Sequence, residues 1–229
     1  NKKLIIISNS SKRKNSSIGR LKSLGFDKNH FIEVMTSGEM IWQEISTSID
    51  NYGNNLKNCF HIFDSSKEDG SEFRNGLEKI NFVSNVDKAN FILACSPFKN
   101  TEPLDYVPIL KDAVVMNLVM FCANPDFITI EKKDNKNMFC MGTIADLYEH
   151  MGGKVVILGK PYKKIYTESC KKIEDLNKSK IVAIGDSLDH DILGANNFNI
   201  DSVLISTGIH KDLFYDGVEI GLNHIKNSK

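Results

Sequence analysis

The sequence predicts an α/β fold built on a Rossmann-like, mostly parallel sheet. Its 229 residues contain short apolar runs that are hydrophobic on both faces, as strands of a parallel sheet are when helices cover both sides. Segments with a helical hydrophobic period separate these runs, and such alternation is typical of right-handed βαβ units. The hydrophobic content of 41% is sufficient for a substantial core.

Short apolar runs are predicted as strands, in chain order: LIIIS (4–8), FIEVM (31–35), CFHIF (59–63), FILAC (91–95), LVMFC (118–122), VVIL (155–158), IVAIG (181–185) and VLIST (203–207). Segments of helical period are predicted as helices: SIGRLKSLGF (17–26), GEMIWQEISTSI (38–49) and TIADLYEHMGG (143–153). The first of these helices stops at Gly25 and the third at two glycines, which commonly end helices.

The chain contains no internal repeat and no linker rich in Pro or Gly, so a second domain has to be an insertion entered through short hinges. TSGE (36–39) and LGKP (158–161) are the predicted hinges. They divide the chain into a core, formed by residues 1–37 and 159–229, and an inserted α/β domain formed by residues 38–158.

Composition and charge exclude several classes of protein. The 29 basic residues balance the 29 acidic ones, whereas a nucleic-acid or membrane-surface partner favours net positive charge. The sequence has no apolar run of membrane-spanning length and no recognisable signal peptide, so a cytoplasmic protein is expected. Five cysteines without a CxxC pair predict buried, reduced thiols.

Polar side chains end three of the predicted strands. Ser8 and Asn9 follow the first run, Asp186 follows IVAIG, and Ser206 and Thr207 end the last run. In sheets of this kind, ligands bind at the carboxyl ends of the strands. If the three strands share one sheet, these side chains converge on one crevice.

The stretch IGDSLDHDI (184–192) places Asp186, Asp189 and Asp191 close together, directly after an apolar run. Carboxylates this close repel one another unless water or a cation lies between them. Oxygen ligands on a rigid loop suit Mg²⁺, especially when a phosphate balances the remaining charge. The alternative is structural, because Asp186 and Asp189 are also common turn and N-cap residues.

Two further segments favour a phosphate site. GKP (159–161) places Lys160 at a helix entrance, where an ammonium group can neutralise a phosphate and a carboxylate. Ser8 and Asn9 lie where a hydroxyl group and backbone N–H groups can hold phosphate oxygens. A solvated lysine and ordinary turn residues are the alternatives at these positions.

Taken in order, ISNSS (7–11), GKP and GDSLDHDI (185–192) resemble the second, third and fourth motifs of the haloacid dehalogenase superfamily. CANPDFI (122–128) is similar to a signature of the branch with an inserted α/β cap, which includes phosphoglycolate, pyridoxal and nitrophenyl phosphatases. TSGE resembles the entrance to that cap. The resemblance spans almost the whole chain.

The resemblance implies a Mg²⁺-dependent phosphatase that hydrolyses a small phosphorylated metabolite. In this mechanism one aspartate attacks phosphorus to form an aspartyl phosphate, and a second protonates the leaving oxygen and later activates water. By motif, Asp186 is a Mg²⁺ ligand and Asp191 supports the water shell of the metal. Lys160 stabilises negative charge on the nucleophile and phosphate. Ser8 and Asn9 bind phosphate oxygens.

The resemblance also makes expectations for the cap. Asn124 and Asp126 would lie near the substrate, and the alternative for both is an ordinary turn. Capped members of this superfamily often pair through the cap, so a homodimer is expected. His190 stands where the family usually has threonine, and no partner is predicted for it.

One motif of the family is absent. No DxDG segment, which would carry the nucleophile and the acid/base, stands before Ser8. In the family this strand lies between the strand that ends at Ser8 and the one that ends at Gly185. An upstream βα segment of roughly 30 residues or more is therefore expected to fill that gap.

Two alternatives belong to other functional classes. A non-catalytic haloacid dehalogenase-like protein would keep the pocket and bind ligands without the nucleophile, whose absence is the one support for this alternative. A receiver-like signalling domain would also use clustered acids and a lysine, but it has no use for an insertion of more than a hundred residues.

Overall fold

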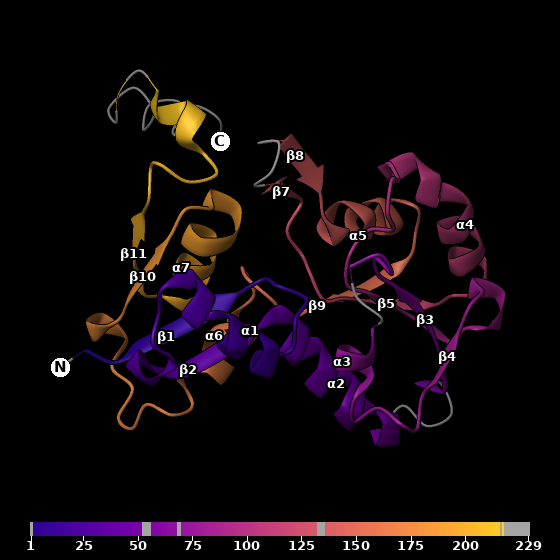
Figure 1. The fold of residues 1–229 in the computed structure, drawn as a ribbon, viewed down its shortest axis with the longest axis horizontal. Coiled ribbons are helices and arrows are strands. Elements are labelled where there is room, and N and C mark those ends of the chain that lie inside the picture. Colours follow the sequence, from indigo (N-terminus) through magenta and orange to yellow (C-terminus); the bar gives the residue numbers. More distant parts are fainter. Residues whose placement is uncertain (1, 52–55, 68–69, 132–135, 216, 218–229) are drawn as a thin grey trace.

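The computed structural model describes residues 2–51, 56–67, 70–131, 136–215 and 217. Their strands form a five-stranded sheet, two separate two-stranded parallel sheets and one antiparallel hairpin. The two parallel pairs lie beside the larger sheet and its helices (Figure 1).

The five-stranded sheet is parallel and has the order β4-β3-β5-β6-β9. Its strands are β3 (Asn58–Ile62), β4 (Asn81–Val83), β5 (Phe91–Ala94), β6 (Val119–Cys122) and β9 (Lys154–Ile157). Helices lie on both of its sides (Figure 1), namely α2 (Ser37–Asn51), α3 (Ser71–Arg74), α4 (Val107–Val115) and α5 (Met141–His150).

Both faces of this sheet are buried in hydrophobic clusters. One cluster joins the sheet to α4 and α5 through side chains such as Leu110 and Ile144. The other joins it to α2 and α3 through side chains such as Ile41 and Phe73. Burial on both faces explains why the strands are continuous apolar runs rather than alternating ones.

The remaining parallel strands form two pairs. They are β1 (Leu4–Ser8) with β2 (Phe31–Thr36), and β10 (Val182–Gly185) with β11 (Asp201–Leu204). A third hydrophobic cluster packs the β1–β2 pair against α6 (Lys163–Cys170) and α7 (Leu193–Phe198). The other elements are α1 (Lys14–Arg20), the hairpin strands β7 (Ile128–Glu131) and β8 (Lys136–Phe139), the π-helical turn η7 (Leu188–Ile192) and the 3₁₀ turns η1 (Lys22–Leu24), η2 (Lys28–His30), η4 (Val86–Lys88), η5 (Pro103–Tyr106), η6 (Lys178–Lys180) and η8 (Lys211–Phe214).

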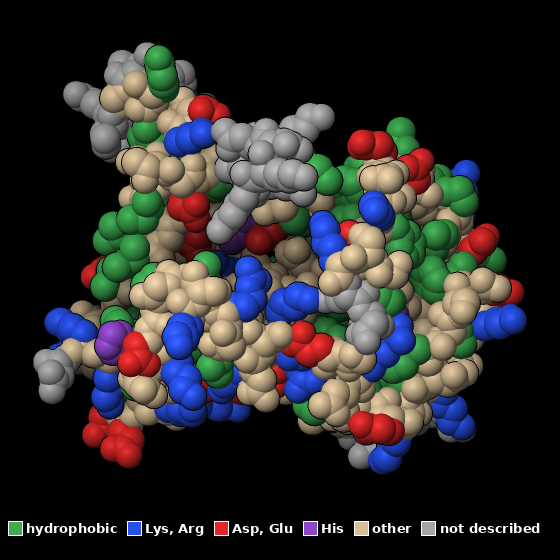
Figure 2. Space-filling model, in the orientation of Figure 1, with side chains coloured by type: hydrophobic (Ala, Val, Ile, Leu, Met, Phe, Trp, Pro, Cys, Tyr) green, Lys and Arg blue, Asp and Glu red, His purple; other side chains and the backbone are tan. Residues whose placement is uncertain are grey.

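The strands that end in the candidate site do not share one sheet. Among the described strands, β1 pairs with β2 and β10 pairs with β11, and no strand connects the two pairs. One face of the β10–β11 pair is apolar and exposed: Val182, Ile184, Val203 and Ile205. Figure 2 shows hydrophobic side chains gathered over these strands. The loops after β10 and β11 line one cavity, and Asn9, at the end of β1, is joined to it through hydrogen bonds to Lys160 and Asp126.

The structure also bears on the expectations for the cysteines and for membrane-spanning segments. All five cysteines are free and buried, as predicted. Among the described residues, no helix is long and apolar enough to cross a membrane. The predicted hinges lie at the junction of β2 with α2 and between β9 and α6, and the domain boundaries drawn through them stay a prediction.

Candidate active site

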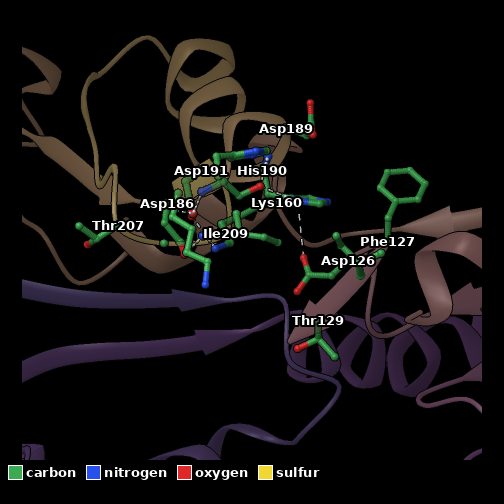
Figure 3. A pocket seen from close by; sticks show the side chains of 15 residues that line it. Asp126, Phe127, Thr129, Lys160, Asp186, Asp189, His190, Asp191, Thr207 and Ile209 are labelled. Atoms are coloured by element: carbon green, nitrogen blue, oxygen red, sulfur yellow. Dashed lines mark hydrogen bonds and ion pairs between the residues drawn. The ribbon is translucent and has the colours of Figure 1, made fainter. Parts of the chain in front are cut away.

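A cavity of about 610 Å³ lies where three parts of the chain meet. One wall is the start of the β7–β8 hairpin, and the others are the segment at Lys160 and the loops that follow β10 and β11 (Figure 3). The lining residues are Asp126, Phe127, Ile128, Thr129, Lys160, Asp186, Ser187, Asp189, His190, Asp191, Thr207, Gly208, Ile209, His210 and Lys211. The loops after β10 and β11 therefore converge on one cavity with Lys160, whereas Ser8 and Asn9, which follow the first strand, are not among its lining residues.

Asp191 is the most constrained acid of the cavity. Its Oδ1 accepts a hydrogen bond of 2.6 Å from Lys160 Nζ, and its Oδ2 accepts the backbone N–H groups of Asp186 and Ser187, each at 3.1 Å. A Cβ atom at Gly185 would lie 2.2 Å from Asp191 Cγ, so glycine is required for this approach. The glycine of the GD pair thus allows the carboxylate to fold back over the strand end.

Asp186 is oriented from the neighbouring loop. Its Oδ2 accepts the backbone N–H of Ile209 at 3.0 Å, and a Cβ atom at Gly208 would lie 2.1 Å from the same oxygen. No hydrogen bond to Asp186 Oδ1 is found within the described part of the chain. This oxygen is available to a ligand in the cavity.

Asn9 connects the first strand to the other walls. The Asn9 Oδ1 accepts the Lys160 backbone N–H at 2.8 Å, and Asn9 Nδ2 donates to Lys160 O at 3.1 Å and to Asp126 Oδ1 at 2.9 Å. The side chain is only 3% exposed. Its amide is therefore engaged with protein groups, which leaves the role of positioning Lys160 and Asp126.

Three predicted site residues lie outside the cavity lining, namely Asn9, described above, and Ser8 and Asn124. Ser8 Oγ accepts the backbone N–H of Ser10 at 3.2 Å, and Asn124 Oδ1 accepts the backbone N–H of Asp126 at 3.3 Å. The second contact is the turn bond that the structural alternative for Asn124 predicts. Phosphate binding by Ser8 and Asn9 and substrate binding by Asn124 stay predictions.

Several lining residues were not predicted as site residues. His190 contacts Ser187 and Asp126, and His210 Nε2 accepts the backbone N–H of Leu188 at 3.2 Å. Phe127 and Lys211 also line the cavity. The partner of His190 could not be predicted, because it depends on how the 124–126 loop packs against η7. The only feature of the sequence that pointed to His190 as a site residue was its position between two aspartates.

The lining has the donor set that a hard divalent cation prefers. Four carboxylates and two lysines face the cavity, and one of those lysines already pairs with Asp191. Within the described residues, no group of three or more His, Cys, Asp or Glu side chains could hold a metal alone. A small number of carboxylate oxygens, completed by water and phosphate, is a common arrangement for Mg²⁺ and an unusual one for Zn²⁺.

Comparisons with known proteins agree with this fold. A HAD-hydrolase-like family model matches residues 157–219. A haloacid dehalogenase-like hydrolase from Brucella suis 1330 has a TM-score of 0.78 and 27% identity, with 91% of this chain and 77% of that chain covered. No curated protein sequence matches this chain.

Two more distant structures share the fold. A p-nitrophenyl phosphatase from Archaeoglobus fulgidus has a TM-score of 0.63 and 20% identity, covering 91% of this chain and 75% of that one. A possible sugar phosphatase from Cytophaga hutchinsonii ATCC 33406 has a TM-score of 0.67 and 19% identity, covering 98% of this chain and 78% of that one.

Fold and site together define an α/β protein with an acidic, lysine-containing cavity at the carboxyl ends of its strands. This is the fold of haloacid dehalogenase-like hydrolases, so the predicted fold class and the resemblance read from the motifs are confirmed. The Brucella suis structure, at 27% identity, is described as a hydrolase, and the two less similar structures support the fold alone.

Proposed function

We propose that this chain belongs to a Mg²⁺-dependent phosphatase that hydrolyses a small phosphorylated metabolite through an aspartyl phosphate. The observation that carries the proposal is the link from Lys160 Nζ to Asp191 Oδ1 at 2.6 Å, in a cavity that Asp186 also lines. A cation beside two carboxylates is the electrostatic environment that transfer of an anionic phosphoryl group requires.

Asp186 would hold Mg²⁺ through Oδ1, and Asp191 would support its water shell, since both oxygens of Asp191 are already hydrogen-bonded to protein groups. When bound, the metal supplies positive charge that offsets the charge of the phosphate. These assignments agree with the roles implied by the motifs. The cavity lining has four carboxylates and two lysines, and this excess of negative charge favours the binding of a cation.

Lys160 is expected to lie beside the transferred phosphate. Its backbone N–H is fixed by Asn9 and its side chain by Asp191, so the ammonium group is preorganised. Ser8 and Asn9 would contribute backbone N–H groups or the Ser8 hydroxyl to phosphate oxygens. Asp126 would contact the leaving group from the opposite wall, with Asn124 holding its turn.

The nucleophile is expected on a strand that lies between β1 and β10. Two features support this placement: the strand pairs carrying Ser8 and Gly185 are separate among the described strands, and an apolar face of β10–β11 is exposed. Unpaired strand edges and uncovered apolar side chains are normally completed by another element. Residues 38–158 would form the cap that closes over the substrate and excludes water.

A homodimer through the cap and a cytoplasmic location stay predictions. The alternative of a non-catalytic binding protein also stays open to test, because it shares every residue of the cavity and differs only in the nucleophile.

Hydrolysis of p-nitrophenyl phosphate by the intact protein tests the proposal. Turnover is expected with Mg²⁺, and its loss is expected after chelation, with recovery when Mg²⁺ is restored. Binding of inorganic phosphate without turnover on any phosphomonoester would favour the non-catalytic alternative. Turnover that is unaffected by chelation would contradict the metal assignment.

A further inference from the structure

His190 connects η7 to the opposite wall of the cavity. Its Nδ1 lies 3.0 Å from Ser187 Oγ and 3.6 Å from Asp126 Oδ1, and its ring centroid lies 6.2 Å from that of Phe127. The side chain is 11% exposed. Figure 3 shows the ring pointing from η7 towards Asp126 and Phe127. His190 is therefore a wall residue of the cavity and a contact between its two sides.

This contact helps to fix Asp126. Asp126 Oδ1 accepts a hydrogen bond from Asn9 Nδ2 at 2.9 Å and lies 3.6 Å from His190 Nδ1, so two elements of the chain flank the same oxygen. Within the described residues, Asp126 Oδ2 has no hydrogen-bond partner, and the side chain is 39% exposed and lines the cavity. The carboxylate thus presents one oriented acceptor to a ligand.

His190 is itself oriented by its own turn, η7. Its Nδ1 lies 3.0 Å from Ser187 Oγ, and the same hydroxyl oxygen accepts the backbone N–H of His190 at 3.2 Å. Ser187 therefore helps to hold the ring beside Asp126.

We propose that His190 determines the leaving-group specificity of the cavity: it holds Asp126 in place and, with it, selects alcohols that carry a free hydroxyl group near the phosphate ester. This inference rests on the proposed function. The oriented Asp126 carboxylate favours a leaving group that donates hydrogen bonds. An alcohol without such a hydroxyl would displace water from this acceptor and leave it unpaired.

The expected preference for leaving groups that carry a hydroxyl depends on how far Asp126 is exposed to water. Fully buried acceptors reject an analogue without the hydroxyl by about 10⁴-fold or more. Here Asp126 is partly exposed, so water can satisfy it in part, and a preference of about tenfold to a hundredfold is expected.

The test uses the intact protein and two esters of the same length, glycerol 1-phosphate and n-propyl phosphate, which differ in the two hydroxyl groups. The ratio of their kcat/KM values is expected to be about 10 or more in the wild type. His190→Thr, which introduces the residue usual in the family, and Asp126→Asn are both expected to bring the ratio towards one. His150→Thr is the matched control, since His150 faces Asp146 on the exposed side of α5 and should leave the ratio unchanged.

Dissociation constants for the same two esters, measured by calorimetry, separate this inference from the proposed function. A wild-type ratio near one, or an undiminished ratio in His190→Thr while turnover continues, would overturn the role of His190 and leave the phosphatase proposal intact. If neither ester is hydrolysed, the ratio of the dissociation constants decides the role of His190. A wild-type preference that is lost in His190→Thr would support it, and equal ratios in the two proteins would overturn it.

Discussion

Lys160 is held on two sides before any ligand arrives. Its Nζ lies 2.6 Å from Asp191 Oδ1, and both side chains are largely buried, at 14% and 15% exposure. Lys160→Ala is expected to cost about 3 to 4 kcal/mol of transition-state stabilisation, as loss of other preorganised charge contacts does. Steady-state kcat/KM on p-nitrophenyl phosphate measures this loss.

Lys164→Ala is the matched control, because Lys164 pairs with Glu44 at 2.6 Å on a more exposed surface of α6. It should change kcat/KM little. Equal activity of the two alanine variants would show that Lys160 has only a packing role.

His61 predicts a pH dependence of stability that is independent of the cavity. Burial, with a smaller contribution from Arg74, lowers the pKa of His61 to about 3. The unfolded chain therefore binds a proton near pH 6.5 that the folded protein does not bind until about pH 3. Stability should be fully present above pH 6.5 and fall as the pH decreases towards 3, by about 2 kcal/mol between pH 7 and pH 5.

Urea unfolding at several pH values checks this slope. His61→Gln should flatten it between pH 7 and pH 5, because the titrating group is removed. Glu33 and Glu39 have pKa values below their usual 4.5. The stability that they contribute is therefore lost mainly as the pH falls below about 4.5. If the stability of His61→Gln depends on pH as strongly as that of the wild type, other groups cause the dependence.

Several residues of the cavity could be predicted from local sequence, whereas their contacts could not. Asp186 and Lys160 follow apolar runs within short motifs, so their placement at strand ends was recognisable. The contacts of Asn9 and His190 with Asp126 were not recognisable from the sequence. They depend on tertiary packing, which brings Asn9 to Asp126 across 117 positions of the chain.

At the scale of elements, every predicted apolar run overlaps a strand in the structure, although β11 ends at Leu204, within the last predicted run. The strands that were missed are β4, β7 and β8, which are only three or four residues long. Each of them contains polar residues, so none forms the uninterrupted apolar run that made strands of similar length, such as β5 and β6, recognisable.

Gly38 shows how closely the first loop approaches α2. A Cβ atom at this position would lie 2.0 Å from the backbone oxygen of Ser11, and the Gly38 N–H donates to Ser10 O at 3.0 Å. Gly38→Ala must displace the loop that follows Asn9, so it is expected to lower the free energy of unfolding by about 2 kcal/mol or more.

Gly19→Ala is the matched control, since Gly19 lies within α1 and a Cβ atom there meets nothing within 4 Å. Alanine should raise the stability by about 0.5 to 1 kcal/mol. Denaturant unfolding of both variants measures these changes. Similar effects at the two positions would contradict the close approach.

At the scale of the whole molecule, the open face of β10–β11 makes a further prediction. Ile184 is 66% exposed here, although its strand lies beside the cavity. If another element covers this face in the intact protein, Ile184→Ser should cost about 2 to 5 kcal/mol of stability. If the face stays open, the cost should be below about 0.5 kcal/mol. Thermal or urea unfolding of the intact protein distinguishes the two.

The central claim is that Asp186 holds Mg²⁺ for phosphoryl transfer. The most direct measurement is the Mg²⁺-dependent turnover of p-nitrophenyl phosphate by Asp186→Asn. The control is Asp189→Asn, which makes the same change from carboxylate to amide at a neighbouring acid of the cavity. We expect Asp186→Asn to abolish turnover with folding nearly intact, and Asp189→Asn to keep most of it. Retained turnover in Asp186→Asn would place the metal elsewhere and contradict the account.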